Sequence, residues 1–323
     1  MHGTFYTILI KNKRNLSISL IFICALYLGL VLFAEPDKVL KAFSKMTLLN
    51  WLAVLGCSFS NYLLRFLRWH YYLRYLQHSI PVSVHFLYYM AGFALTVTPA
   101  KVGETIRSAY LAQHAIPYTR SLAMFFTERF LDVVIISLLS LFTLKLSLSK
   151  AHADMHNFII ISAIVIVSFI PLLRQTFVTQ LLSTLQNKIS WQRLKNVLQH
   201  LIQLFLTARD LFSAKPIYIG IFLGAIAWII QGIAFYFILN KLNIDVTLQQ
   251  SMGIYAISLL AGALSFIPGG IGTTEAVMTL LLSFIGADTA TAIAAALISR
   301  LSTLWFAVSL GFITASLLTL SNK

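Results

Sequence analysis

Long apolar segments alternate with short polar ones along most of this chain. Apolar runs, most of them roughly 17 to 25 residues long and so able to cross hydrocarbon as helices, lie at about 15–34, 48–67, 121–146, 157–173, 216–239 and 290–319. Backbone N–H and C=O groups cannot be left unpaired in lipid, so these segments are expected to be helical. The pattern predicts an all-α, polytopic membrane helix bundle with six full spans.

Two further apolar stretches, at about 83–115 and 250–286, are interrupted near the middle and read LTVTPAKVGET and LSFIPGGIGTTE. Proline ends a helix and glycine permits the chain to turn. Each stretch is therefore expected to be a re-entrant hairpin of two broken helices, with a kinked full span as the alternative. The expected hairpin breaks are at Pro99, Gly103, Pro268, Gly269, Gly270 and Gly272.

The two interrupted stretches also resemble each other. A proline, a glycine, a glutamate and, 25 residues after the glutamate, an arginine recur at a nearly constant shift. The matched residues are Pro99, Gly103, Glu104 and Arg129 in the first half and Pro268, Gly272, Glu275 and Arg300 in the second. Three spans separate the hairpins, so the second should enter from the opposite face. An inverted repeat of this kind is common in secondary transporters, which hold substrate near the bilayer midplane.

Composition agrees with a membrane protein. The chain is 59% hydrophobic and 11% charged with a mean hydropathy of +0.83, more apolar than a soluble core of 323 residues requires. A polar stretch at about 174–215 carries apolar residues at helical spacings and predicts an amphipathic cytoplasmic connector. It divides a single transmembrane domain, residues 1–323, into halves at about 1–173 and 216–323.

The net charge of +14 does not indicate a nucleic-acid partner, because the basic residues lie mostly between apolar runs. Most of them lie on the side of the N-terminus, which predicts that both termini are cytoplasmic. The chain is thus expected to be a multi-pass membrane protein. Its two cysteines and scattered histidines lack metal-ligand spacing, so neither a cofactor nor a metal is expected; oligomeric state is not predictable.

Ionisable residues within apolar segments are the candidate substrate-binding site, because such groups are costly in a membrane and usually pair or face a cavity. They are Arg65, Arg68, Lys101, Glu104, Arg107, Glu128, Arg129, Asp132, Glu275 and Arg300. Guanidinium groups match phosphate, which favours headgroup binding. The alternative is a structural lattice in which glutamates neutralise Arg129 and Arg300. For Arg65 and Arg68, the alternative is a plain cytoplasmic anchor among aromatic residues.

The motifs NYLLRFLRW, PAKVGETIR, ERFLD and PGGIGTTE, with the late arginine Arg300, resemble the flippase-like family named after the transmembrane region of lysylphosphatidylglycerol synthase. The resemblance extends from about Leu16 to Leu318. It implies a bundle with two re-entrant hairpins that translocates lipids in the bacterial inner (cytoplasmic) membrane. The chain ends at Lys323 without the aminoacyltransferase domain of that enzyme, so its aminoacyl-lipid substrate is not assumed.

The leading hypothesis is a non-enzymatic translocase for an anionic lipid or a lipid-linked glycan. The headgroup would pass between the two hairpins while the tail stays in lipid. The expected partners are anionic lipids, together with enzymes of envelope-lipid or glycan synthesis. No GxxxxGK[ST] motif is present, so ATP binding of that type is not expected. An intramembrane lipid-modifying enzyme and an accessory scaffold of an envelope synthase are the alternatives.

Overall fold

The computed structural model describes residues 29, 36–147, 180, 182–186 and 192–321. Its elements, in chain order, are α3 (Pro36–Ser44), α4 (Leu48–Tyr75), α5 (Val82–Gly92), η1 (Phe93–Leu95), η2 (Pro99–Thr105), α6 (Ile106–Ala112), α7 (Tyr118–Ser147), α11 (Gln192–Leu211), α12 (Ala214–Lys241), α13 (Leu248–Leu264), η3 (Pro268–Gly270), α14 (Thr273–Phe284), α15 (Thr289–Arg300), η4 (Leu301–Trp305) and α16 (Phe306–Ser321). Among these residues there is no strand. The predicted all-α fold class is confirmed for this part of the chain.

Several helices are suited to a membrane. In the described part of the chain, α12 and the continuous segment 289–320 are long and apolar enough to cross one, and the pair α3 and α4, bent by 84°, could supply a third span. Four predicted spans, 48–67, 121–146, 216–239 and 290–319, coincide with α4, α7, α12 and α15 to α16. The predicted spans 15–34, apart from residue 29, and 157–173 lie outside the described residues, so the total of six remains a prediction.

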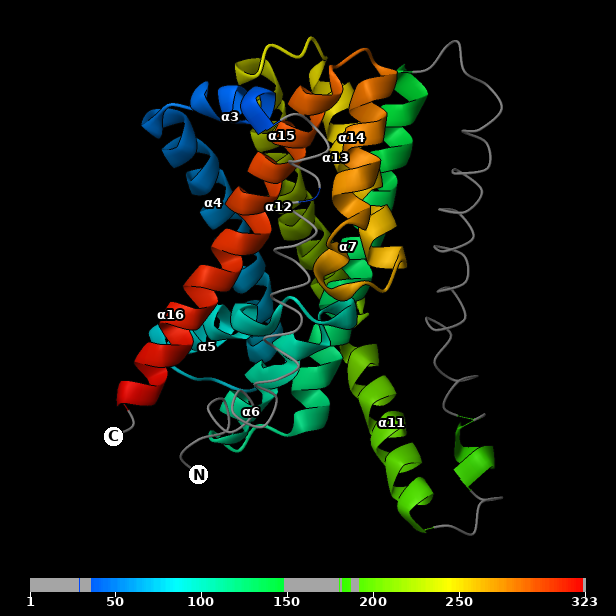
Figure 1. Ribbon diagram of the computed structural model, residues 1–323. Helices are drawn as coiled ribbons and strands as arrows, with labels where there is room; N and C mark the ends of the chain where they lie inside the picture. The colour runs from blue at the N-terminus through cyan, green and yellow to red at the C-terminus, as the bar shows by residue number, and fades with distance from the viewer. Residues whose placement is uncertain (1–28, 30–35, 148–179, 181, 187–191, 322–323) are drawn as a thin grey trace.

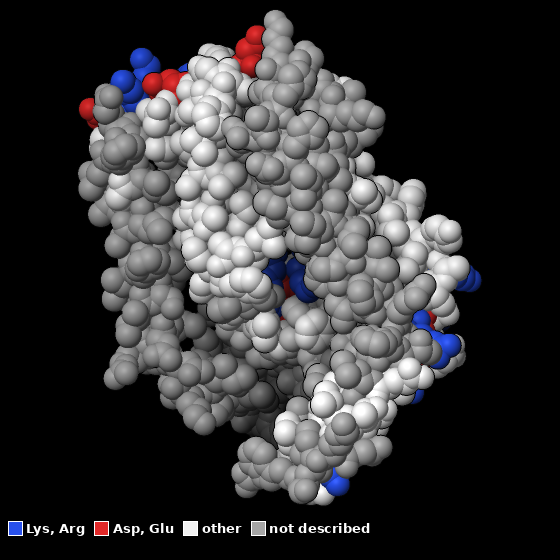
Figure 2. All heavy atoms as spheres, turned by 90° about the vertical axis from the view of Figure 1, so that its right-hand side faces the viewer, with Lys and Arg blue, Asp and Glu red and all other residues white. Residues whose placement is uncertain are grey.

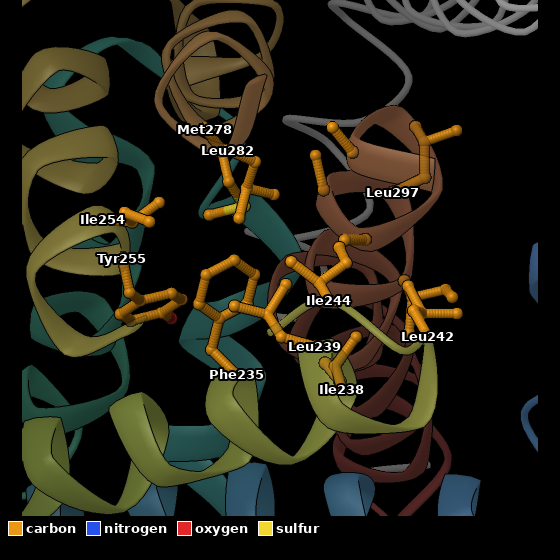
Figure 3. Close-up of a cluster of buried hydrophobic side chains, with 14 of the residues drawn as sticks. Phe235, Ile238, Leu239, Leu242, Ile244, Ile254, Tyr255, Met278, Leu282 and Leu297 are labelled. Atoms are coloured by element: carbon orange, nitrogen blue, oxygen red, sulfur yellow. The ribbon is translucent and has the colours of Figure 1, made fainter. Parts of the chain in front are cut away.

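The main apolar core lies where α12, α13, α14 and α15 meet (Figure 3). Phe235 and Leu239 of α12 lie between Tyr255 of α13, Leu282 of α14 and the apolar side chains of α15. On α15 the buried positions are mostly small, namely Ala290, Ala292, Ala294, Ala295 and Ala296. Small side chains let helices approach closely, which is how membrane helices gain packing energy without a hydrophobic driving force.

Both interrupted stretches form helix, break and helix, as expected. In the second, α13 ends at Leu264, η3 forms the turn, and α14 packs back against α13 (Figure 1). In the first, α5 runs into η1 and η2, and α6 packs back against α5. The two breaks contact each other through η2 and η3. Their depth in a bilayer and their entry from opposite faces remain predictions.

The two breaks share part of their local conformation. Pro99 and Pro268 each begin a 3₁₀ turn, where the missing N–H of proline is tolerated. Two residues later, Lys101 and Gly270 both adopt left-handed backbone angles, with φ of 56° and 64°. Gly103 is needed for a different reason, because a Cβ there would collide with the Leu95 carbonyl oxygen. The match is partial, because Gly272, which is aligned with Gly103, has a φ of 86° whereas Gly103 has no left-handed φ.

The predicted connector is described only in part. Helix α11 packs against α7. Its N-terminal end extends away from the bundle (Figure 1). Arg209 and Asp210, near its end, are exposed. A helix in this region is confirmed, while its cytoplasmic location and its contact with a membrane surface stay predictions.

Candidate functional site: a buried charge cluster beside a cavity

Two helices supply the centre of a buried charge cluster. Arg65 and Arg68 are three residues apart on α4, and Glu128 and Asp132 are four apart on α7, so each pair lies on one helix face. The Nη2 atom of Arg65 lies 3.3 Å from Glu128 Oε1 and 3.2 Å from Asp132 Oδ2. Arg68 Nη2 lies 3.3 Å from Glu128 Oε1 and 2.8 Å from Asp132 Oδ1. The two acids and the two arginines therefore neutralise each other between the helices.

Arg129 belongs to the same cluster. Successive helical residues point in different directions, yet its flexible side chain brings Nη2 to 2.9 Å from Glu128 Oε1 and 3.3 Å from Asp132 Oδ2. The same nitrogen is 3.9 Å from Glu104 Oε2. Its side chain keeps 17% of its surface exposed, against at most 6% for its partners. Arg129 is thus the arginine of this cluster with the most room for a ligand.

The first break is held to this cluster by Arg107 and Glu104. Arg107 Nη2 lies 3.0 Å from Glu104 Oε2, and its Nε donates to the Tyr89 carbonyl oxygen at 3.1 Å. The guanidinium also lies over the Tyr89 ring, 3.9 Å from its centroid, a favourable cation–π contact in a buried site. Thr96 donates to the other oxygen of Glu104 at 2.5 Å. Glu104 and Arg107 are therefore structural partners that fix the end of η2.

The second break carries its own ion pair. Arg300 Nε donates to Glu275 Oε1 at 2.9 Å, and its Nη2 donates to the Gly269 carbonyl oxygen. Glu275 Oε2 accepts from Gly272 N–H at 2.8 Å and so caps the start of α14, where a negative charge is favoured. The chain continues from Arg300 into the π-helical turn η4. Arg300 thus ties η3 to the junction of α15 and α16.

A cavity of about 390 Å³ lies between the two halves and receives side chains from both breaks. Its charged lining residues are Arg65, Lys101, Glu104, Arg129, Asp132 and Arg300. Figure 2 shows charged atoms inside an opening in the middle of one face, beside uncharged residues of the described part of the chain. Exposed apolar residues of the second break, including Phe266 and Ile267, also line the cavity. A polar interior therefore adjoins an apolar rim.

The structure brings together most of the predicted site residues. Arg65, Arg68, Glu104, Arg107, Glu128, Arg129 and Asp132 form one network, with Lys101 beside it on the cavity wall, while Glu275 and Arg300 form a separate pair across the cavity. The interpretation of Arg65 and Arg68 as a plain cytoplasmic anchor is wrong, because only 5% and 0% of these residues are exposed and both pair with acids inside the protein. Whether these residues bind substrate stays a prediction.

Several residues that donate hydrogen bonds to the acids of the charge cluster were not predicted from the sequence. Tyr89 donates to Glu128 at 3.0 Å, Trp228 donates to Asp132 at 3.3 Å, and Thr96 donates to Glu104. All three lie in apolar segments, where a hydroxyl or indole N–H does not reveal its partner. The available signal is general: buried Tyr and Trp usually find an acceptor. Such residues on helices facing α7 were therefore reasonable candidates.

A second cleft, of about 600 Å³, lies at the surface between the end of α4, the start of α7 and the end of α11. Arg120 lines it and donates to the Leu76 carbonyl oxygen at 2.9 Å, with His78 Nε2 2.6 Å away. Burial and the neighbouring Arg120 lower the pKa of His78 below its ordinary value. Because Arg120 is committed to these contacts, the central cavity is the stronger candidate site.

The chemistry available in the central cavity is the binding of negative charge. In its charged lining, four cationic side chains accompany two carboxylates. Among the described residues there is no group of three or more His, Cys, Asp or Glu side chains placed to hold a metal ion. The fold and site define a helical membrane protein with a cation-rich internal cavity.

A model of the family described as the lysylphosphatidylglycerol synthase transmembrane region matches residues 16–311, and the chain belongs to this family. It is 25% identical over 327 residues to the UPF0104 membrane protein MJ1595 of Methanocaldococcus jannaschii, covering 94% of each chain. Shorter matches are to UPF0104 membrane proteins of Methanothermobacter thermautotrophicus, 26% identical over 32% of this chain and 31% of the relative, and of Pyrococcus horikoshii, 33% identical over 27% and 25%. These relatives are membrane proteins by name, which agrees with the apolar helices.

Proposed function

We propose that this protein is a membrane translocase for an anionic lipid or lipid-linked glycan. The observation that carries the proposal is the cavity between the two breaks, which combines cationic side chains from both halves with an exposed apolar rim. A headgroup with negative charge fits the polar interior, and a hydrocarbon tail fits the rim and the surrounding lipid. The name of the family, which refers to a lipid synthase, supports a lipid-related role.

The arrangement of charges supports a cavity that stays hydrated. Burying unpaired charge is expensive, so ionisable groups in membrane proteins pair with each other or face water. Arg68, Arg107 and Glu128 are nearly inaccessible and paired, whereas Arg129 and Lys101 border the cavity. The paired, inaccessible side chains can hold helices in place, and Arg129 and Lys101 can exchange a contact with water for a contact with a headgroup oxygen.

The membrane topology belongs to this proposal. The two breaks would lie near the bilayer midplane as re-entrant hairpins related by an inverted repeat, and both termini would be cytoplasmic. Repeat-related hairpins that meet at one cavity give alternating access a structural basis. The contact between η2 and η3, and the left-handed backbone at both Lys101 and Gly270, support such a relation.

The proposal is tested with purified protein in liposomes that carry trace lipids with labelled headgroups of different charge. Wild type should accelerate exchange of anionic lipid between leaflets above the rate in protein-free vesicles. Arg129→Gln should reduce this exchange, because it removes a charge from the cavity wall. Arg209→Gln is the matched control, since Arg209 is exposed on α11 and outside the cavity lining, and should exchange lipid at the wild-type rate.

Absence of exchange by folded wild-type protein, over phospholipids and polyprenyl-linked sugars of several charges, would overturn the translocase proposal. Equal exchange by wild type and Arg129→Gln would leave translocation standing and remove Arg129 from the headgroup path. Mass spectrometry of the vesicle lipids after the assay would detect a modified product, which would instead show an enzyme.

A further inference from the structure

We propose that Lys101 is the residue that selects an anionic phosphoryl headgroup in the central cavity, an inference that rests on the proposed translocase function. The selecting group would be its ammonium, which acts together with the guanidinium of Arg129. Both residues line the cavity, and the two are close enough to interact electrostatically. The substrate class is thereby narrowed to lipids with a negatively charged phosphoryl group.

The backbone at Lys101 is the first observation. Its φ of 56° is left-handed, a conformation that costs energy for a residue with a Cβ. At the matching position of the second break the chain has Gly270, whose φ is 64° and for which the conformation carries no such cost. A left-handed residue thus stands at the same place in both breaks, as a glycine that suits this conformation in the second and as a lysine that does not in the first.

The partners of Lys101 are the second observation. Glu104, Glu128 and Asp132 are all engaged by arginines or by Tyr89 and Trp228. Lys101 also interacts electrostatically with Glu104 and Asp132, but within the described part of the chain its ammonium forms no hydrogen bond and no ion pair within 4.0 Å. It is partly exposed, on the cavity wall. The combination of a left-handed backbone, a cation without an ion pair and a place on the cavity wall makes Lys101 a candidate ligand contact, because strained residues cluster at functional sites.

The chemistry of the two cations points to phosphate oxygen. Arg129 offers a planar set of donors with 17% of its side chain exposed, and Lys101 adds a compact point charge with three donors. Neither group can accept a hydrogen bond, so the pair favours an oxygen-rich anion over a sugar hydroxyl. A zwitterionic headgroup also carries phosphate, but its ammonium would be repelled by the cation surplus of the cavity.

Four variants separate charge from backbone conformation. Lys101→Gly removes the charge and relieves the left-handed strain, Lys101→Met removes the charge and keeps the strain, and Lys101→Arg keeps the charge. Ala115→Gly is the matched control, since Ala115 also has a left-handed φ, 58°, and does not line the cavity. The melting temperatures of Lys101→Gly and Ala115→Gly should be no lower than that of wild type.

The first readout is the exchange of labelled phosphatidylglycerol and phosphatidylcholine in liposomes. Lys101→Gly and Lys101→Met should lower the ratio of anionic to zwitterionic exchange about tenfold, the size expected for one charge-assisted hydrogen bond. Lys101→Arg and Ala115→Gly should keep the wild-type ratio. A wild-type ratio in Lys101→Gly, or an equal loss for both lipids, would overturn the selecting role.

The second readout is binding in detergent, which does not depend on transport. Phosphatidylglycerol should raise the melting temperature of wild type and Lys101→Arg, and should raise that of Lys101→Gly and Lys101→Met much less. If wild type binds in this way but exchanges no lipid, the translocase function fails while the Lys101 site stands. Equal stabilisation of wild type and Lys101→Gly overturns the site. Inorganic phosphate at matched ionic strength should have little effect, and stabilisation by phosphate alone would contradict a lipid ligand.

Discussion

Replacement of Arg300 by methionine should destabilise the protein strongly. Arg300 and Glu275 form an ion pair at 2.9 Å with side chains 6% and 1% exposed, and Arg300 also donates to the Gly269 carbonyl oxygen. Methionine preserves the apolar part of the side chain and leaves a carboxylate buried without its guanidinium. Breaking a buried pair from one side costs about 3–5 kcal/mol. We expect a loss of this size in the free energy of unfolding.

The double variant Glu275→Gln/Arg300→Met gives the sharper result. It removes both charges, and a glutamine oxygen can still accept from Gly272 N–H, as Glu275 Oε2 does at 2.8 Å. The double variant should therefore be more stable than Arg300→Met alone, with a coupling energy between the two positions of about 2 kcal/mol or more. The expected order of stability is wild type, then the double variant, then Arg300→Met.

The measurement is reversible unfolding by sodium dodecyl sulfate in mixed micelles, followed by tryptophan fluorescence. Arg209→Met is the matched control, because Arg209 is exposed, and its stability should stay near that of wild type. Additive losses in the double variant, with a coupling energy near zero, would refute the reasoning, since they would mean that the pair contributes no more than two independent surface charges.

Two further predictions concern packing and pH. Gly311→Ala should destabilise the protein by about 1–3 kcal/mol, because a Cβ on α16 would collide with the η1 backbone at Ala94. The control is Gly56→Ala in α4, where nothing lies within 4 Å of the added Cβ, and this variant should be neutral or slightly stabilising. Equal effects of the two variants on thermal unfolding would contradict this packing. His78 has a pKa below its ordinary value in the folded state, so its contribution to stability is present above the unfolded pKa and is lost as pH falls through the lower folded pKa. Melting temperatures measured from pH 7.5 downward should decrease less steeply for His78→Gln than for wild type, and parallel curves would contradict the assignment.

The sequence allowed the helix breaks and the identity of the charged residues to be predicted, because both are local. Proline and glycine interrupt apolar runs regardless of the fold, and a charged residue in such a run requires a partner. The choice of partner could not be predicted, since it depends on how α4 and α7 face each other. Arg65 and Arg68 showed this most clearly: aromatic neighbours indicated an interface, whereas Glu128 and Asp132 across the helix contact hold both inside.

The sequence repeat predicted where the backbone breaks, but it did not predict the contacts of the side chains. It predicted matching turns at Pro99 and Pro268, but the two arginines at equivalent positions have different roles. Arg300 donates to the backbone of its own break through Gly269, whereas Arg129 contacts acids on its own helix and Glu104. The difference arises because three-residue spacing on α7 places Asp132 within reach of Arg129, a local choice that no repeat comparison would reveal.

The ion pairs between α4 and α7 also bear on how the chain enters the membrane. A helix that carries Glu128, Arg129 and Asp132 is poorly suited to move from the translocon into lipid by itself, since each charge near the centre of a span raises the free energy of insertion by about 2.5–3.5 kcal/mol. Arg65 and Arg68 on the earlier helix offset much of that cost once the two helices are adjacent. We therefore expect α4 and α7 to insert together during synthesis. Their acidic and basic groups would then be matched before α12, which contributes Trp228 to Asp132, is added.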